Sequence, residues 1–585
     1  MNEETNKIKE KAMYILSKSA LYMLLIMGVA ISITTIGLEL GIKISRWHFP
    51  VACVLAAGII GLFMRKDGWK KYICVVAGTL IVLLIIIVLS GKVVDVSWDG
   101  NTYHKDAVGA LKNGWNPYQE DYITFYKNSR LRDMDYLDDK IELTKGFWQT
   151  YYAKGTWYIA ADIYAMTGQI SNGKAYTIMI MFVLFGLVLP YLTEKKLEII
   201  EAVLGGILVS CTPVTLIQMF SYYNDGVLAL LLETIIISFL ILMDQRCERG
   251  MVEKYLWVCT SIMIIIQVKF TGLGYAGFFC ALLFVFWAYR LFKEKKYKEI
   301  GSAVMIFAAT VIFSVVVVGW NPYVTNALEK GNPFYPLAGE GKVDIVSYNQ
   351  PASFEKKNTI EKLVTSLFSY TDNIQKASGM EPKWKIPFHI TKTELEKLSQ
   401  IDLRIAGFGV LFSGILLLSI LCIIGVWRKL YRSKKNIAWI VLGFLGVIIG
   451  LLSGISESWW ARYSPYLYFV PLVALVLACL YDKGIWKQYV SKVIMLLLLL
   501  NSAFVVFYGV NVKIQKSSEE KQILQQLSNT GKSIRLQKNN TFVGCLYELD
   551  DRNISYQFVE TIDKPDGTLM SGKIPYKLSD AKESR

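Results

Sequence analysis

The sequence predicts an all-α polytopic membrane protein with about thirteen transmembrane helices. Of its 585 residues, 53% are hydrophobic and only 19% are charged, and the mean hydropathy is +0.37. The apolar residues form uninterrupted blocks, many of them near the roughly 17–25 residues that a helix needs to cross a bilayer. Backbone amides in hydrocarbon have no water partner, so each block must be helical. A soluble protein of this length would instead divide its apolar residues among several cores covered by charged surface.

Thirteen blocks qualify as spans. The second and the seventh are short enough for a tilted or partly re-entrant segment. The predicted spans are 20–43, 49–64, 72–91, 175–193, 198–220, 226–244, 255–268, 272–291, 301–320, 405–427, 437–455, 465–481 and 493–511.

The loops predict the orientation of the chain. Seven alternate loops are rich in Lys or Arg, and all seven lie on one side of the membrane if the thirteen spans are correct: MNEETNKIKEKAMYILSK, RKDGWKK, TEKK, DQRCERGMVEK, RLFKEKKYKE, WRKLYRSKKN and DKGIWKQYVSK. Because basic loops stay in the cytoplasm, the N-terminus is predicted to be cytoplasmic and the C-terminus extracytoplasmic, in a multi-pass protein of the cell (plasma) membrane. Much of the net charge of +15 belongs to these loops, so it does not indicate binding to nucleic acid.

The long polar segments all fall on the outer side. We expect a transmembrane domain over 1–511, with outer loops at 92–174 and 321–404, and a small extracytoplasmic domain over 512–585. In that tail, TFVGCLYEL and ISYQFVETI read as short strands between polar turns, which predicts a small α/β cap.

Two further patterns occur in the outer loops. TWYIAADIYAMTG in the first loop predicts an amphipathic helix lying in the membrane interface. The pentapeptide GWNPY occurs at Gly114–Tyr118 and again at Gly319–Tyr323. Chance recurrence of an interfacial turn explains the second pattern at least as well as an ancient duplication.

Several kinds of active site have no counterpart in the sequence. The nine cysteines are scattered, with no CxxC pair or Cys/His cluster, so neither a disulfide framework nor a zinc site is indicated. There is no phosphate-binding loop, dinucleotide glycine pattern or GxSxG elbow. Energy for any chemistry would therefore arrive in an already activated substrate.

The segment after the third span carries the densest set of candidate residues: Asp99 and His104 as catalytic groups, and Asp95, Asn101 and Tyr103 as substrate-binding groups. A carboxylate at the membrane surface is partly desolvated, which raises its pKa and suits it to accept a proton. The chain contains only three histidines, and one is here. The plainer interpretation of His104 is an interfacial ring stacked on a neighbouring aromatic.

Two shorter outer turns add polar groups. Asn224 and Asp225 lie between two spans, where Asp225 could also serve only as a helix cap. Glu233 lies deeper on the same helix, a position where ionisable groups are usually functional. Lys269 is a cation on the outer side, which either binds an anion or extends its charged end toward the headgroups.

A fourth turn contains Arg462 and Tyr463 within the sequence ESWWARYSP. The planar guanidinium suits phosphate oxygens, either of a lipid headgroup or of a lipid-linked substrate. A weaker fifth candidate is Asp402 with Arg404, which could be only an interfacial ion pair. Together these turns predict a pocket for an isoprenoid-phosphate sugar, with cations on the phosphate and a carboxylate that deprotonates an acceptor hydroxyl. A single displacement would invert the anomeric carbon.

The chain also resembles the GT-C class of polytopic membrane glycosyltransferases, which includes the protein O-mannosyltransferases and the aminoarabinose transferases. WDGNTYHKDAVGALKNGWNPY (Trp98–Tyr118) follows the class layout of an acidic motif, a Tyr, a small apolar helix and a Gly-x-x-Pro turn. The resemblance implies a GT-C-like fold, with Asp99 as the catalytic base and Asp225 as the second outer acid. It also implies that Lys269 (in KFTG) and Arg462 (in WWARY) are the phosphate-binding cations.

The class often has Asp-Glu in the first loop, whereas here Gly100 follows Asp99. This departure argues against a paired-acid metal site, so we expect no required cofactor, although the class allows a divalent metal. The predicted partners are a polyprenyl-phosphate sugar donor, a glycan, lipid or protein acceptor, and membrane lipids. A transporter or flippase of lipid-linked saccharides, and a polysaccharide polymerase or ligase, are the alternatives. A transporter would be expected to place helix-breaking and charged residues at mid-bilayer depth.

Overall fold

The computed structural model describes residues 3–128, 146–538 and 542–579, and most of them are helical. In this described part, ten helices are long and apolar enough to cross a membrane, by length and composition. The protein is therefore a multi-pass membrane protein. The ten are Asn6–Glu39, Trp69–Gly91, Ile170–Glu194, Asp225–Met243, Met251–Val268, Phe270–Lys293, Tyr297–Val317, Phe412–Ser433, Lys435–Gly454 and Trp486–Thr530.

Three shorter apolar helices are His48–Met64, Ile199–Ser210 and Pro465–Tyr481. Each of the thirteen predicted ranges thus contains an apolar helix, but the count of thirteen crossing helices is not confirmed. The predicted span over 198–220 is broken. Helix α10 (Ile199–Ser210) ends before Thr212, whose side chain caps α11 (Pro213–Gln218). Pro213 cannot donate to the preceding turn and restricts the residue before it.

The remaining bundle helices are given with their bounds as follows: α1 (Glu3–Glu39), α2 (His48–Met64), α3 (Trp69–Gly91), α9 (Tyr176–Glu194), α12 (Asp225–Met243), α13 (Met251–Val268), α14 (Phe270–Lys293), α15 (Tyr297–Ile312), α19 (Phe412–Ser433), α20 (Lys435–Gly454), α21 (Phe469–Tyr481) and α22 (Ser491–Phe504). Helices α1 and α12 form the interior of the bundle, since their apolar windows are 78% and 89% buried. These windows are largely apolar on every face, as expected of a helix surrounded by other helices.

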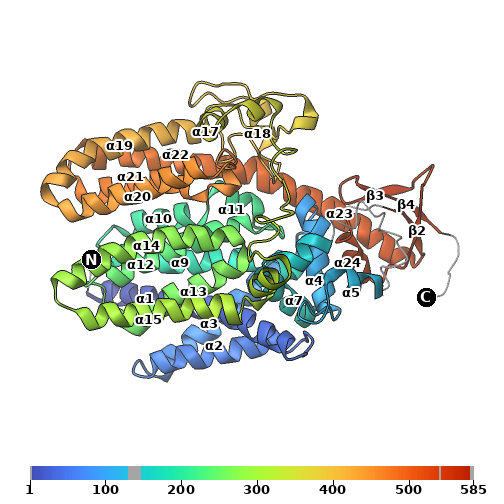
Figure 1. The fold of residues 1–585 in the computed structure, drawn as a ribbon, viewed down its shortest axis with the longest axis horizontal. Coiled ribbons are helices and arrows are strands. Elements are labelled where there is room, and N and C mark those ends of the chain that lie inside the picture. The colour runs from blue at the N-terminus through green and yellow to red at the C-terminus, as the bar shows by residue number, and fades with distance from the viewer. Residues whose placement is uncertain (1–2, 129–145, 539–541, 580–585) are drawn as a thin grey trace.

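The outer loops form short helices and turns: η1 (Gly100–His104), α4 (Lys105–Lys112), α5 (Tyr122–Asn128), α7 (Gly155–Thr167), α8 (Ile170–Gly173), η4 (Trp320–Val324), α16 (Thr325–Lys330), η5 (Ala352–Lys356), α17 (Thr359–Leu367), η6 (Lys376–Ser378), α18 (Lys392–Lys397), η7 (Ala461–Tyr463) and η8 (Pro465–Tyr468). Figure 1 shows α4, α5 and α7 beyond one end of the bundle, beside the C-terminal sheet, while the beginning of α1 lies at the other end.

The last apolar helix continues out of the bundle. The run from η9 (Trp486–Val490) through α22 and η10 (Val505–Val510) to α23 (Asn511–Thr530) is helical over 45 residues. Figure 1 shows α23 reaching from the bundle to the sheet. The predicted domain boundary at 511 therefore lies inside one continuous helix, and the division into two domains stays a prediction.

The C-terminal region folds as a four-stranded sheet in the order β2-β1-β4-β3. Strand β1 (Ile534–Gln537) pairs in parallel with β2 (Tyr556–Val559), with Ile534 opposite Tyr556. It pairs antiparallel with β4 (Ile574–Leu578), which also pairs antiparallel with β3 (Gly567–Leu569). The small α/β cap predicted at this end of the chain is therefore present, and we call residues 531–579 the cap.

One predicted strand of the cap is confirmed and the other is wrong. ISYQFVETI contains β2. In TFVGCLYEL, Cys545–Leu549 instead belong to the helix α24 (Cys545–Asp550) and are buried, while the first residue of the segment lies outside the described residues. Helix α24 packs against α4 of the first outer loop, and this tertiary contact overrides the local preference for strand.

The helix predicted in the first outer loop is also present, but it is buried and does not lie in the membrane interface as predicted. Helix α7 is buried at every position from Gly155 to Tyr164, because it packs against α4, α8 and α1. It is thus an internal support of the outer region and not an amphipathic surface helix.

The two GWNPY segments contact each other. Asn321 Nδ2 donates to the carbonyl of Pro117 at 3.0 Å, and Asn321 Oδ1 accepts a hydrogen bond from the buried Lys154 at 2.6 Å. Lys154 also donates to the carbonyl of Tyr152 at 2.9 Å. The first and second outer loops are therefore tied together by backbone and side-chain hydrogen bonds.

Gly109 of α4 offers a test of the contact between the first outer loop and the cap. A Cβ at this position would lie 2.2 Å from the ring of Tyr547, which is buried. Gly109→Ala should lower stability by about 1–3 kcal/mol through overpacking, seen as a lower thermal unfolding midpoint in detergent. The control is Gly58→Ala in α2, where nothing lies within 4 Å and Ala should be neutral or stabilising by up to about 1 kcal/mol. Equal midpoints for the two variants would contradict the close packing.

Candidate active site

Most of the predicted site residues meet at one cavity of about 600 Å³, a volume within the range of about 300–1,000 Å³ that is usual for small-molecule sites. Its walls come from the first outer loop, the turn before α12, the break between α13 and α14, the second outer loop and the segment before α21. The predicted residues that line it are Asp99, Tyr103, His104, Asn224, Asp225, Lys269, Arg462 and Tyr463.

Arg462 lies at the centre of the charged groups. Its Nη1 is 3.3 Å from Asp99 Oδ2, 3.2 Å from Asp402 Oδ1 and 3.8 Å from Asp225 Oδ2. The guanidinium also lies over the ring of Trp460, 4.4 Å from its centroid. A planar cation can bind carboxylates in its plane while it stacks on an aromatic face. One side chain therefore brings together carboxylates from three separate segments of the chain.

Lys269 forms the second cationic group. The backbone of Lys269 is extended (φ −161°, ψ 142°) between α13 and α14. Its Nζ lies 2.5 Å from Asp225 Oδ1. Asp225 also accepts from Gln218 Nε2 at 3.3 Å. Asp225 is the first residue of α12, and the N-cap position belongs to Asn224. Pairing with Lys269 and Arg462 thus accounts for Asp225 better than helix capping does.

Asp99 is placed where its proton affinity is high. Burial raises the pKa of this carboxyl and Arg462 lowers it. The negative charges of Asp402 and Asp225 raise it again, and the net result is a pKa of about 6. The next residues form the π-helical turn η1, which directs Tyr103 and His104 to the same cavity. A carboxylate with this pKa is suited to accept a proton near neutral pH.

His104 is held as a neutral ring. Burial lowers its pKa to about 3, and Trp157 Nε1 donates to its Nδ1 at 2.7 Å. The ring also lies 4.2 Å from that of Tyr103, so the stacked interpretation from the sequence describes this part of its surroundings. With Nδ1 acting as acceptor, the proton resides on Nε2. His104 therefore offers a hydrogen-bond donor and not a free base.

Asp95 and Asn101, predicted to bind substrate, do not line the cavity. Asp95 is fully buried, and its carboxylate accepts from the amides of Ser97 at 2.9 Å and Tyr222 at 2.8 Å. Asn101 donates to the carbonyls of Asp95 and Ser97 at 2.9 and 2.8 Å. In this arrangement both side chains shape the loop that carries Asp99.

Asp402 has a larger part in the site than the interfacial ion pair that the sequence predicted. Besides Arg462, it contacts Arg404, whose Nη2 is 3.3 Å from Asp402 Oδ2 and 2.7 Å from Asn349 Oδ1. Asn349 belongs to the cavity wall built by residues 342–349 of the second outer loop. The Asp-Leu-Arg spacing was visible in the sequence, but nothing in it showed that Arg462 lies beside this pair.

Two buried donors of cavity residues have no hydrogen-bond partner among the described residues: Arg462 Nε and Asn224 Nδ2. Both donors are available to a bound group that carries acceptor oxygens. Together with the charge of Lys269, they suit an anionic group with several oxygens. Within residues 3–128, 146–538 and 542–579, no group of three or more His, Cys, Asp or Glu is placed to hold a metal ion.

Comparisons with known proteins give one structural similarity. No protein-family model matches the chain, and no curated protein matches it. Among solved structures, the chain is similar to ArnT from Cupriavidus metallidurans, in a crystal structure bound to undecaprenyl phosphate. The TM-score is 0.44 and the identity 9%, over 83% of this chain and 85% of that one. A similarity of this size carries no argument about the class or the activity of this chain.

The cationic side of the cavity can be tested with a short-chain alkyl phosphate. Calorimetry should detect its binding to the native protein, and Lys269→Gln should weaken binding about 10- to 100-fold, because a hydrogen bond to a charged group contributes about 1.5–3 kcal/mol. Lys330→Gln is the matched control, since Lys330 lies on the rings of Tyr151 and Tyr335 and outside the cavity wall. The same loss in both variants, or in neither, would contradict an anion site at Lys269.

Proposed function

We propose that this protein is a membrane glycosyltransferase that moves a sugar from a polyprenyl-phosphate donor to an acceptor hydroxyl, with Asp99 as the general base. The observation that carries the proposal is the convergence of Asp99, Asp225, Lys269 and Arg462 on one cavity. A base, two cations and unpartnered donors beside one another are the groups that this transfer needs.

The proposed reaction is a single displacement. The acceptor oxygen forms a bond to the anomeric carbon, its proton passes to the Asp99 carboxylate, and the bond from that carbon to the phosphate oxygen breaks. The electron pair of the broken bond leaves with the polyprenyl phosphate, and the configuration of the sugar is inverted. Lys269 and Arg462 stabilise the charge that develops on the leaving phosphate.

The other cavity residues have supporting roles in this proposal. Asp225 orients Lys269 at 2.5 Å, and the neutral His104 and Asn224 supply hydrogen-bond donors to the sugar or phosphate. Aromatic rings from Tyr103 and Tyr463 form part of the wall, and such rings can pack on the apolar face of a sugar. The acceptor could be a glycan, a lipid or a protein hydroxyl.

The proposed orientation in the membrane rests on the Lys- and Arg-rich loops of the sequence. The cavity is built from segments predicted to lie outside the cytoplasm, and a lipid-linked donor would reach it from the outer leaflet. We therefore propose a protein of the cell membrane with a cytoplasmic N-terminus and an extracytoplasmic cap.

The base is tested by turnover of polyprenyl-phosphate sugars with purified protein. Asp99→Asn should lower the transfer rate by about 10²–10⁴-fold, because the amide cannot accept the acceptor's proton. The control is Asp121→Asn, an exposed acid in the same outer loop, which should retain the native rate. Equal rates for Asp99→Asn and the native chain would remove Asp99 from the role of base. Movement of the lipid across the bilayer without sugar transfer would favour a transporter instead.

The pKa of Asp99 predicts the pH dependence. A general base acts when ionised, so the rate should fall about tenfold per pH unit below about pH 6. Asp402→Asn removes a charge that raises the pKa of Asp99 and leaves Arg462 freer to lower it, so this acid limb should move to lower pH. The measurement is the pH profile of kcat/KM, which reports ionisation of the free enzyme, with Asp121→Asn as the unshifted control. A limb that moves to higher pH in Asp402→Asn would contradict the assignment.

A further inference from the structure

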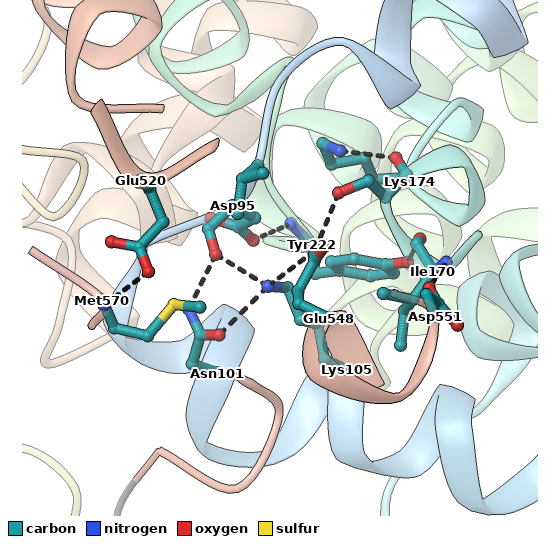
Figure 2. A network of polar contacts seen from close by, with 12 residues as sticks. Asp95, Asn101, Lys105, Ile170, Lys174, Tyr222, Glu520, Glu548, Asp551 and Met570 are labelled. Atoms are coloured by element: carbon teal, nitrogen blue, oxygen red, sulfur yellow. Dashed lines mark hydrogen bonds and ion pairs between the residues drawn. The ribbon is translucent and has the colours of Figure 1, made fainter. Parts of the chain in front are cut away.

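The cap and the first outer loop share a buried network of charged and polar groups. Figure 2 shows Glu548 of the cap beside Lys105, with Asp95 and Asn101 on the other side of the lysine. Lys105 Nζ is 3.4 Å from Glu548 Oε1, and the two side chains are 0% and 1% exposed. Burying an ammonium group costs free energy unless the group is paired and fully hydrogen-bonded. Loss of the Glu548 partner would therefore destabilise the position of Lys105.

The ammonium group of Lys105 also donates hydrogen bonds to the loop that carries Asp99. It donates to the carbonyl of Asp95 at 2.8 Å and to Asn101 Oδ1 at 3.1 Å. These two residues flank Asp99 in the sequence, and Lys105 directly follows His104. One ammonium group therefore holds both ends of the segment 95–104, which contains the proposed base.

Glu548 is itself fixed from two sides. Its Oε1 accepts from Ser171 Oγ at 2.7 Å, and its Oε2 is 2.9 Å from Arg552 Nη1. Lys105, Arg552 and Lys174 outweigh burial and lower the pKa of Glu548 to about 2. The carboxylate is therefore ionised at every pH at which the proposed base works.

The backbone of the cap also approaches the loop closely. The amide of Gly544 donates to the carbonyl of Asn101 at 2.8 Å, and a Cβ at Gly544 would lie 3.0 Å from Asn101 backbone atoms. The ring of Trp98, next to Asp99, meets that of Phe542 edge to face at 5.2 Å. The cap thus contacts the loop on both sides of Asp99.

We propose that Glu548 is a positioning residue of the active site, acting through Lys105 to hold Asp99 in place, so that the cap is a working part of the catalytic unit. This inference rests on the proposed transfer reaction. It does not require Glu548 to touch the substrate, since Glu548 does not line the cavity.

Glu520 provides a matched control. It is a carboxylate with 2% exposure, and it lies in α23 on the other side of Asp95 (Figure 2). It accepts from the amides of Met570 and Ser571 at 2.8 and 3.1 Å. These bonds hold α23 to the sheet, so Glu520→Gln perturbs the cap and changes a charge near Lys105, while every hydrogen-bond partner of Lys105 stays in place.

The experiment compares Glu548→Gln with Glu520→Gln, measured per amount of folded full-length protein. Glu548→Gln should lower kcat about 10- to 100-fold, since a small displacement of a reacting group has effects of this size, while KM for the donor changes less than about twofold, because Lys269 and Arg462 remain. Glu520→Gln should keep the native kcat. An equal loss of kcat in both variants, or none in Glu548→Gln, would overturn the proposal.

A second readout separates this proposal from the proposed function. Amide hydrogen exchange over residues 97–104 should be faster in Glu548→Gln than in the native chain, and unchanged in Glu520→Gln. If the native chain transfers no sugar, the transferase proposal fails, and the exchange measurement still decides whether the cap holds the loop: equal exchange in both variants would overturn it. If Glu548→Gln does not fold, Ser171→Ala removes only one bond to Glu548 and should shift kcat and exchange in the same direction by less.

Discussion

The contact on which the rest of the site depends is the guanidinium of Arg462 among three carboxylates. Asp99, Asp225 and Asp402 come from distant parts of the chain, and their mutual repulsion would separate them without a cation between them. Arg462 lies 3.2–3.8 Å from all three and is stacked on Trp460. The segments that carry these residues can therefore meet at one cavity, with the acids close together and only partly neutralised.

The same arrangement sets the chemical difference between the acids. Asp225 has Lys269 at 2.5 Å, whereas Asp99 has only a longer contact to Arg462 and feels two neighbouring negative charges. Burial then raises the pKa of Asp99 to about 6. Two carboxylates on one cavity thus differ in proton affinity, because their surroundings and not their identities differ.

The cap also helps to hold the loop that carries Asp99, from outside the helix bundle. Glu548 and Lys105 form a buried pair whose lysine also binds both flanks of the Asp99 loop. A loop at a membrane surface has few neighbours to restrict it, so precise placement of its side chains needs support from a second layer of contacts. The continuous helix from Trp486 to Thr530 carries that support from the bundle to the cap.

The sequence alone determined the apolar helices, the α/β cap and the four turns with Asp99, Asp225, Lys269 and Arg462, because hydrophobic block length and charge placement are local properties. It could not determine that α24 is a helix, or that Asp402 and Glu548 reach the same region. Those outcomes depend on contacts between residues far apart in the chain, such as the 443 positions between Lys105 and Glu548. Only the tertiary structure decides which buried charges meet, because a charge leaves water only where its partner is already in place.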